Sequence, residues 1–242
     1  MSSEVLFQLA PTGTLRAGIN MSNFLLVTGK AANGDPQGVS PDMARAIADR
    51  LGVPMTLVPF KTPGELADAA GTGAWDIGNI GAEPQRAKTI DFTAAYVEIE
   101  ATYLVPAGSP LQSIADVDKA GIRIAFPPRS AYGLYLSNNI EHAELVPAEG
   151  SGAVFELFVN EKLDALAGLR PGLIGDVEKL PGSRMLDGQF SAVQQAVGTA
   201  KGNDAGAAFL SDFVEEMKAS GFVAGLIEKH GVTGRLTVAP AG

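Results

Sequence analysis

The chain has 242 residues, of which 46% are hydrophobic, and it carries a formal net charge of −9 without any cysteine. It is long enough to bury one large core or two smaller ones, and we expect a soluble globular protein. The acidic balance, without a cluster of Lys and Arg, argues against a nucleic-acid partner, and the absence of cysteine excludes disulfides, thiolate metal sites and a cysteine nucleophile.

Apolar, strand-like runs alternate with helical periodicity along nearly the whole chain, which predicts an α/β fold with largely parallel sheets. The first strand is expected at 15–19. Ser40 is expected to cap a helix that starts at Pro41 and ends at Gly52, because serine before proline is a typical helix start and glycine a typical stop. A second strand is expected at 55–60.

The pattern continues with a short helix and a third strand at 75–80. Thr62 and Glu65, with proline between them, form a capping-box pattern that opens this helix. From Ile99 a second series of strand and helix patterns begins: IRIAF, SAYGLYLSNN, AELVPA, SGAVFELFVNE, DALAG and PGLIGDVEKL. Residues 184–200 then read as long extended chain, and two helices are expected at the end, at 204–220 and 222–230.

Two α/β units with extended chain on both sides of the second predict a discontinuous first unit. We expect residues 1–101 and 194–242 to form lobe one, and residues 102–193 to form lobe two. No repeat of fixed period and no low-complexity linker interrupts this arrangement.

The order of short sequence blocks carries a family resemblance. The blocks are GTLRAGI, GVSPDMARAIADRLGVPMTLVPF, GAWDIG, EPQRAKTIDFTAAY, IADVDKAGIRIAF and LDALAG. In this order the chain resembles the type 2 periplasmic solute-binding proteins, in particular family 3, which supplies polar amino acids and related solutes to ABC importers. The resemblance covers residues 13–231, and the run PxRAxxIDFTxxY is its most specific part.

The resemblance implies a two-lobed fold of mostly parallel sheets flanked by helices, with two hinge strands joining the lobes. It also implies hinge closure on a small-molecule ligand, an ABC permease as the membrane partner, and a monomer in the periplasm. No segment is long and apolar enough for a membrane span, and the start has no signal-peptide pattern, so the protein is expected in the cytoplasm if Met1 is its native start.

Arg86 is the principal candidate for ligand binding. In family members with a similar motif the resemblance implies that this arginine grips the ligand carboxylate, and a guanidinium offers a planar fork suited to that role. A surface arginine paired with Glu83 or Asp91 is the alternative, and such pairs contribute about 0 to 1 kcal/mol.

The loop before Arg86 departs from the family pattern, in which hydroxyl side chains bind the ligand head group. This chain has Asn79, Gly81 and Glu83 there, with Gly81 in place of the serine and Glu83 in place of the threonine. A carboxylate close to Arg86 would weaken its pull on an anionic ligand or bind a cationic group. All three residues are candidates for the site.

A second departure lies in lobe two. Amino-acid binders of the family usually carry an acid after the L-D-A run, whereas this chain continues Leu169-Arg170-Pro171. The anion-binding turn appears with Arg129 and Ser130, where Ser130 is either a ligand contact or only a helix cap. Losing an acid and gaining Arg129 and Arg170 points to a ligand with more negative or less positive charge than an amino acid. Asp164 is expected to be structural.

Further candidates come from the strand ends and the hinge. Asn20, Asn23 and Phe24 follow the first strand, where the family has cleft-lining residues, although Phe24 packed into the core is equally consistent. Glu100, with Glu98, alternates onto one face of the first hinge strand, and Gln195 lies at the return hinge. Trp75 is expected in the core.

No catalytic motif, cofactor motif or metal site is evident, so the chain is expected to be a binding protein and not an enzyme. His142 and His230 are far apart in sequence and are expected at the surface. Two alternatives remain open. One is an enzyme similar to the cyclohexadienyl dehydratases that share this fold, with Glu83 as proton shuttle opposite Arg86. The other is a cytosolic solute binder or sensor.

Overall fold

The structure is a computed structural model that describes residues 2–242. The chain divides into two compact units, each of which is described by itself. Unit 1 runs up to Glu98 and resumes with Gln194–Gly242, and unit 2 is Ile99–Val193. The chain therefore passes between the units inside strand β7 (Val97–Val105) and inside strand β12 (Ser191–Ala200).

Unit 1 is built on a mixed sheet with strand order β4-β1-β5-β12, in which β4, β1 and β5 are parallel and β12 is antiparallel to β5. Its other strands pair at the margins: β6 with β12, β13 with the start of β7, and β2 with β3. The helices are α1 (Ser3–Leu9), α2 (Val39–Leu51), α3 (Pro63–Asp68), α7 (Asp204–Ala219), α8 (Phe222–Lys229) and the 3-10 helix η1 (Arg86–Lys88). The strands are β1 (Leu15–Asn20), β2 (Gly29–Lys30), β3 (Pro36–Gln37), β4 (Met55–Phe60), β5 (Ile77–Gly81), β6 (Ile90–Phe92) and β13 (Thr237–Val238).

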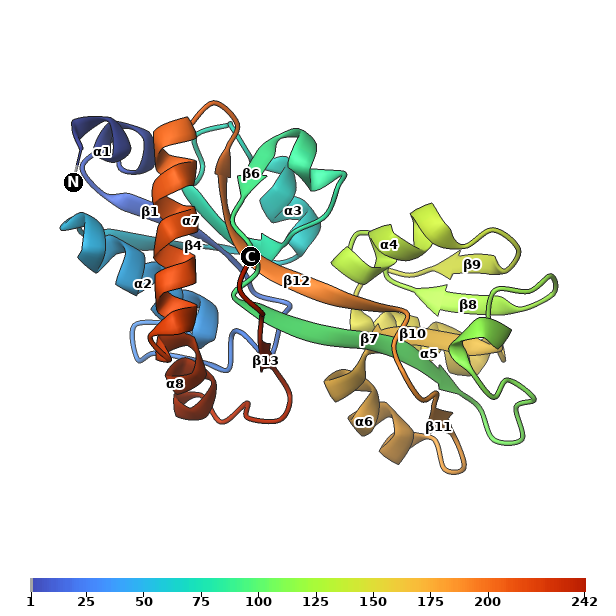
Figure 1. Ribbon diagram of the computed structural model, residues 1–242. Helices are drawn as coiled ribbons and strands as arrows, with labels where there is room; N and C mark the ends of the chain where they lie inside the picture. Colours follow the sequence, from blue (N-terminus) through green and yellow to red (C-terminus); the bar gives the residue numbers. More distant parts are fainter. Residues whose placement is uncertain (1) are drawn as a thin grey trace. The chain divides into compact units, whose positions relative to one another are not determined.

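Trp75 fills the space between the sheet and α3, as expected of a core residue. Its indole N–H donates to the backbone oxygen of Leu66 at 3.0 Å, and the side chain is 3% exposed. The indole lies against the sheet because Gly18 and Gly78 have no side chains there: a Cβ on Gly18 would lie 3.2 Å from the ring. Two glycines in neighbouring strands thus make room for one large aromatic residue next to α3, which is labelled in Figure 1.

The start of α2 differs from the expectation. Gly38, not Ser40, is the residue that precedes the helix, and no side chain caps it. Gly38 has φ 151°, and a Cβ there would lie 2.2 Å from the backbone oxygen of Leu26, so only glycine fits. The predicted cap at Ser40 is therefore wrong: its hydroxyl instead shares a 2.8 Å hydrogen bond with the hydroxyl of Tyr96. The predicted stop at Gly52 is confirmed, since it caps the helix in the left-handed conformation.

Unit 2 has the strand order β7-β10-β8-β9, in which β10, β8 and β9 are parallel and β7 is antiparallel to β10. Strand β11 pairs with β7 on its other side. The strands are β8 (Arg123–Phe126), β9 (Glu144–Pro147), β10 (Ala165–Leu169) and β11 (Arg184–Met185). The helices are α4 (Ala131–Asn139), α5 (Ser151–Asn160), α6 (Arg170–Lys179) and the 3-10 helix η2 (Ile114–Asp116).

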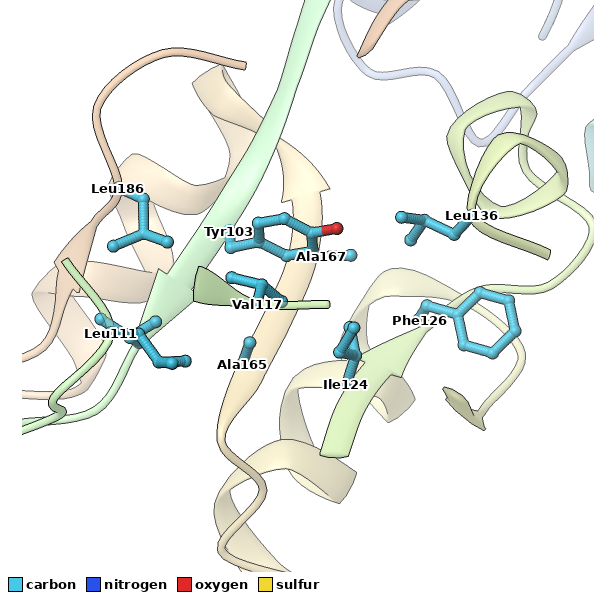
Figure 2. Close-up of a cluster of buried hydrophobic side chains, with 10 residues drawn as sticks. Tyr103, Leu111, Val117, Ile124, Phe126, Leu136, Ala165, Ala167 and Leu186 are labelled. Carbon is cyan, nitrogen blue, oxygen red and sulfur yellow. The ribbon is translucent and has the colours of Figure 1, made fainter. Parts of the chain in front are cut away.

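The core of unit 2 is formed around Tyr103 of β7. The Tyr103 ring extends across the cluster between Leu186 and Leu136 of α4 (Figure 2). Phe190 packs on the same ring with a centroid distance of 4.5 Å. Phe190 follows a turn at Gly188, which has φ 76°, so the expected extended stretch 184–200 is instead two strands separated by a turn.

Each unit uses an aspartate in the same way where a strand begins. The Asp76 carboxylate, just before β5, accepts the backbone N–H of Arg16 at 2.8 Å. The Asp164 carboxylate, just before β10, accepts the backbone N–H of Arg123 at 2.8 Å. Both bonds join neighbouring parallel strands, and the structural role expected for Asp164 is confirmed. Within residues 2–242 no helix has the length and apolar character that crossing a membrane requires.

Replacing Trp75 tests the packing of unit 1. Trp75→Ala is expected to lower the free energy of unfolding by about 3 to 5 kcal/mol because it empties the space between α3 and the sheet. Trp75→Phe is expected to cost less, about 1 to 2 kcal/mol, because it removes mainly the bond to Leu66. Urea unfolding followed by circular dichroism measures both. A cost below about 1 kcal/mol for the alanine variant would contradict this packing.

Candidate functional site

The first group of candidate residues lies at one edge of the unit 1 sheet. Strands β1 and β5 are parallel, with Ile19 opposite Asn79, so their carboxyl ends lie at the same edge. The segments that follow these strands, 20–26 and 81–86, therefore leave the sheet side by side. In open α/β sheets, ligands bind outside the carboxyl ends of the strands.

The segment that carries Arg86 is fixed to the sheet at its start. Gly81 is opposite Gln195 of β12, and the backbone N–H of Ala82 donates to the backbone oxygen of Gln194 at 2.7 Å. The Nη1 of Arg86 donates to the backbone oxygen of Gly81 at 2.7 Å, and the side chain is buried. The guanidinium is thus held by the strand end that precedes it.

Glu83 lies in the same turn as Arg86. The backbone N–H of Ala87 donates to the backbone oxygen of Glu83 at 2.9 Å, which closes the turn over these residues. The Glu83 side chain is half-buried. Burial raises the pKa of the Glu83 carboxyl above its usual value, and the positive charge of Arg86 offsets part of this shift. The turn therefore presents a carboxyl and a guanidinium in a partly dehydrated environment.

The segment after β1 is ordered by its asparagines. The amide oxygen of Asn20 accepts the N–H and hydroxyl of Ser22, and that of Asn23 accepts the N–H of Leu25. Phe24 is not a core residue, because 44% of it is exposed. The guanidinium carbon of Arg235 lies 5.5 Å from its ring centroid. The contact with Arg235 was not predictable from local patterns, because the two residues are far apart in the sequence.

Asn79 and Gln195 are buried inside unit 1. The Asn79 side chain is 1% exposed, and both atoms of its amide lack a hydrogen-bond partner among residues 2–242. Gln195 is bonded to Tyr96, whose backbone N–H donates to the Gln195 backbone oxygen at 2.9 Å. Burial raises the pKa of Tyr96 to about 12, against the effect of hydrogen bonds with Ser40 and Gln195. In this structure both amides belong to the packed interior.

The second group lies at the equivalent edge of unit 2. Strands β8 and β10 are parallel, so the turn before α4 and the start of α6 leave the sheet at the same edge. Ser130 caps α4: its hydroxyl accepts the N–H of Gly133 and donates to the backbone oxygen of Pro127, both at 2.9 Å. Arg129 precedes the cap and is exposed. A capped helix start next to an arginine favours an anion.

Arg170 and Glu100 form an ion pair within unit 2. The Nε of Arg170 donates to a carboxylate oxygen of Glu100 at 2.6 Å, and its Nη2 donates to the backbone oxygen of Gly188. The positive charge of Arg170 is therefore balanced by the negative charge of Glu100. This weakens the expectation of a strongly anionic ligand, because the positive charge of Arg170 is already balanced within unit 2.

The histidines differ from each other. His142 is exposed, as expected. His230 is not simply a surface residue, because its Nε2 lies 2.8 Å from a carboxylate oxygen of Asp42, which also accepts from Lys229 at 2.7 Å. Burial by itself would raise the pKa of Asp42, but these two partners outweigh it and leave the pKa lowered. Residues 2–242 contain no group of histidine and acidic side chains that could hold a metal ion.

A model of one protein family matches most of the chain. A model described as bacterial extracellular solute-binding proteins, family 3, matches residues 15–233. Curated protein sequences gave no match.

Solved structures are similar over nearly the full length. The solute receptor for L-cysteine of Neisseria gonorrhoeae has a TM-score of 0.76 at 19% identity and covers 99% of this chain and 100% of its own. A substrate-binding protein of an amino acid ABC transporter from Streptococcus pneumoniae, bound to L-arginine, has 0.73 at 22%, covering 92% and 96%. An ancestral amino acid-binding protein, a precursor of cyclohexadienyl dehydratase, has 0.73 at 23%, covering 93% and 97%. These similarities confirm the expected fold.

Gly133 tests how the turn before α4 is built. A Cβ at this position would lie 1.9 Å from the backbone oxygen of Pro127 and 2.9 Å from the hydroxyl of Ser130. Gly133→Ala is therefore expected to lower the free energy of unfolding by about 1 to 3 kcal/mol. The control is Gly152→Ala in α5, where nothing lies within 4 Å and a small gain is expected. Equal unfolding curves for the two variants would refute the described turn.

Replacing Asn79 tests whether its buried amide lowers the stability of the fold. Asn79→Leu keeps the branching of the side chain and removes its polar atoms, so the free energy of unfolding is expected to rise by about 1 to 2 kcal/mol. The matched control is the exposed Asn138, where Asn138→Leu is expected to change stability by less than about 0.5 kcal/mol. A loss of stability for Asn79→Leu would show that the amide is hydrogen-bonded in solution.

Proposed function

The chain belongs to the bacterial extracellular solute-binding proteins, family 3, and we propose that it is the substrate-binding component of an ABC importer. Its solute is a small molecule with a carboxylate, amino-acid-like or an organic acid, captured by hinge closure of the two lobes. Ligand affinity for the closed state supplies the free energy for closure, and the permease recognises the closed form.

The observation that carries this proposal is the fixed position of Arg86. Its guanidinium is held by the Gly81 backbone oxygen at the carboxyl edge of the unit 1 sheet. A buried guanidinium pairs strongly with a carboxylate because little water competes for its N–H groups. Asn20, Asn23 and Phe24 leave the same edge, and the exposed Phe24 ring offers an apolar surface for the rest of the solute.

Unit 2 contributes a second set of contacts in this proposal. The start of α4, capped by Ser130, supplies backbone N–H groups and the positive end of the helix dipole. Arg129 adds a positive charge next to them. Arg170 and Glu100, already paired with each other, contribute a polar but nearly neutral surface.

The partner and the location are proposed by analogy with the family. We propose an ABC permease as the membrane partner, a monomeric receptor, and a periplasmic or extracellular location, which is typical of the family. A cytosolic binder or sensor is the alternative.

A dehydratase activity is the second candidate, and the half-buried Glu83 next to Arg86 is the observation that favours it. An acid with a raised pKa can shuttle a proton to or from a carboxylate substrate that an arginine holds. Incubation with prephenate-like cyclohexadienyl acids, followed by ultraviolet detection of an aromatic product, tests this. We expect no turnover above the uncatalysed reaction.

Arg86 is tested with a solute found by thermal shift. A panel of amino acids, dicarboxylates, aromatic acids and polyamines is screened, because a ligand of the folded state raises the melting temperature. For a carboxylate-bearing solute found this way, Arg86→Lys is expected to weaken binding at least tenfold, about 1.4 kcal/mol, because lysine cannot form the bidentate pair. The control is Arg45→Lys at an exposed position of α2, with no expected change.

Calorimetry measures these affinities, and circular dichroism verifies that each variant is folded. The carboxamide analogue of the same solute gives a test that leaves the protein unchanged, and it is expected to bind the unaltered chain at least tenfold more weakly. Affinities within about threefold for both Arg86→Lys and the carboxamide would refute the role of Arg86.

A further inference from the structure

We propose that Glu83 binds a cationic group of the solute, so that the turn 83–86 recognises an amino acid by both of its charges. In this inference, which rests on the proposed function, Arg86 takes the carboxylate and Glu83 takes the ammonium group. The solute class is then an α-amino acid, and its head group is read by unit 1.

The position of the Glu83 carboxylate supports this role. Glu83 and Arg86 lie in one turn whose start is fixed to β5 and β12. The Glu83 carboxyl is close enough to Arg86 for the positive charge of the guanidinium to act on its pKa. A turn that holds separate positive and negative groups matches a zwitterion, whose two charges are also adjacent.

The burial of Glu83 gives the energetic reason. A half-buried carboxylate has lost part of its hydration, and this destabilises the charged form, as the raised pKa indicates. A bound ammonium group would restore a favourable partner and donate directly to the carboxylate. Part of the hydration cost of the free protein would thereby be offset when the solute binds.

Unit 2 lacks the acid that the family resemblance places after β10. The position after β10 where the family resemblance expects an acid is occupied by Leu169 and Arg170. Glu100 lies near this position, but its carboxylate is paired with Arg170 at 2.6 Å. An ammonium group placed there would have to compete with a guanidinium that is already bonded.

The test measures how tightly the unaltered chain and two variants bind each amino acid and its analogue without the ammonium group. The probes are the standard amino acids and, for each one that raises the melting temperature, its desamino acid, in which hydrogen replaces the ammonium group. Glu83→Gln removes the charge and keeps the size. The control is Glu228→Gln, at an exposed position of α8 in the same unit. Calorimetry gives the affinity of each pair.

The unaltered chain is expected to bind the amino acid at least tenfold more tightly than its desamino acid. Glu83→Gln is expected to weaken binding of the amino acid at least tenfold and to leave the desamino acid within about threefold, because only the amino acid carries the group that Glu83 contacts. Glu228→Gln is expected to change neither affinity.

Two results would overturn the inference in distinguishable ways. If carboxylic acids without an ammonium group bind the unaltered chain as tightly as amino acids, or if Glu83→Gln keeps its affinity for the amino acid within about threefold of the unaltered chain, the role of Glu83 is wrong while solute binding through Arg86 stands. If no carboxylate-bearing solute binds at all, the proposed function fails together with this inference.

Discussion

The parallel pairing of β1 with β5 determines where the candidate site of unit 1 lies. With Ile19 opposite Asn79, the two strands end at one edge of the sheet, and the segments after them emerge together. Residues separated by about 60 positions in sequence thereby become neighbours. Unit 2 repeats the arrangement with β8 and β10, and in both units an aspartate that binds a backbone N–H of the neighbouring strand supports the register.

The same edge explains how the candidate binding groups are held in place. Gly81 is part of the ladder with β12, and its backbone oxygen holds Arg86. Behind the edge, Tyr96 joins Ser40 to Gln195 in the interior of the unit. Tyr96 and Gln195 lie close in sequence to the two points where the chain leaves and re-enters unit 1. Preorganised groups of this kind lose less conformational entropy on binding.

Local patterns predicted most of the fold but little of the pairing between side chains. The strand at 55–60 and the end of α2 at Gly52 were predictable because apolar periodicity and glycine act within a few residues. The Ser40 cap was not, because its hydroxyl bonds to Tyr96, 56 residues away. The charge balance at Arg170 was not predictable either, because its partner Glu100 lies 70 positions earlier. Interactions at such separations depend on strand order, which periodicity does not report.

The central claim is that a carboxylate-bearing solute is held by the turn that contains Arg86. The most direct measurement is a crystal structure of the protein with the solute that gives the largest thermal shift. The account predicts that the solute carboxylate lies within hydrogen-bond distance of the Arg86 guanidinium, at the carboxyl edge of the unit 1 sheet. A solute bound elsewhere, or one whose carboxylate contacts other groups and not the Arg86 guanidinium, would contradict it.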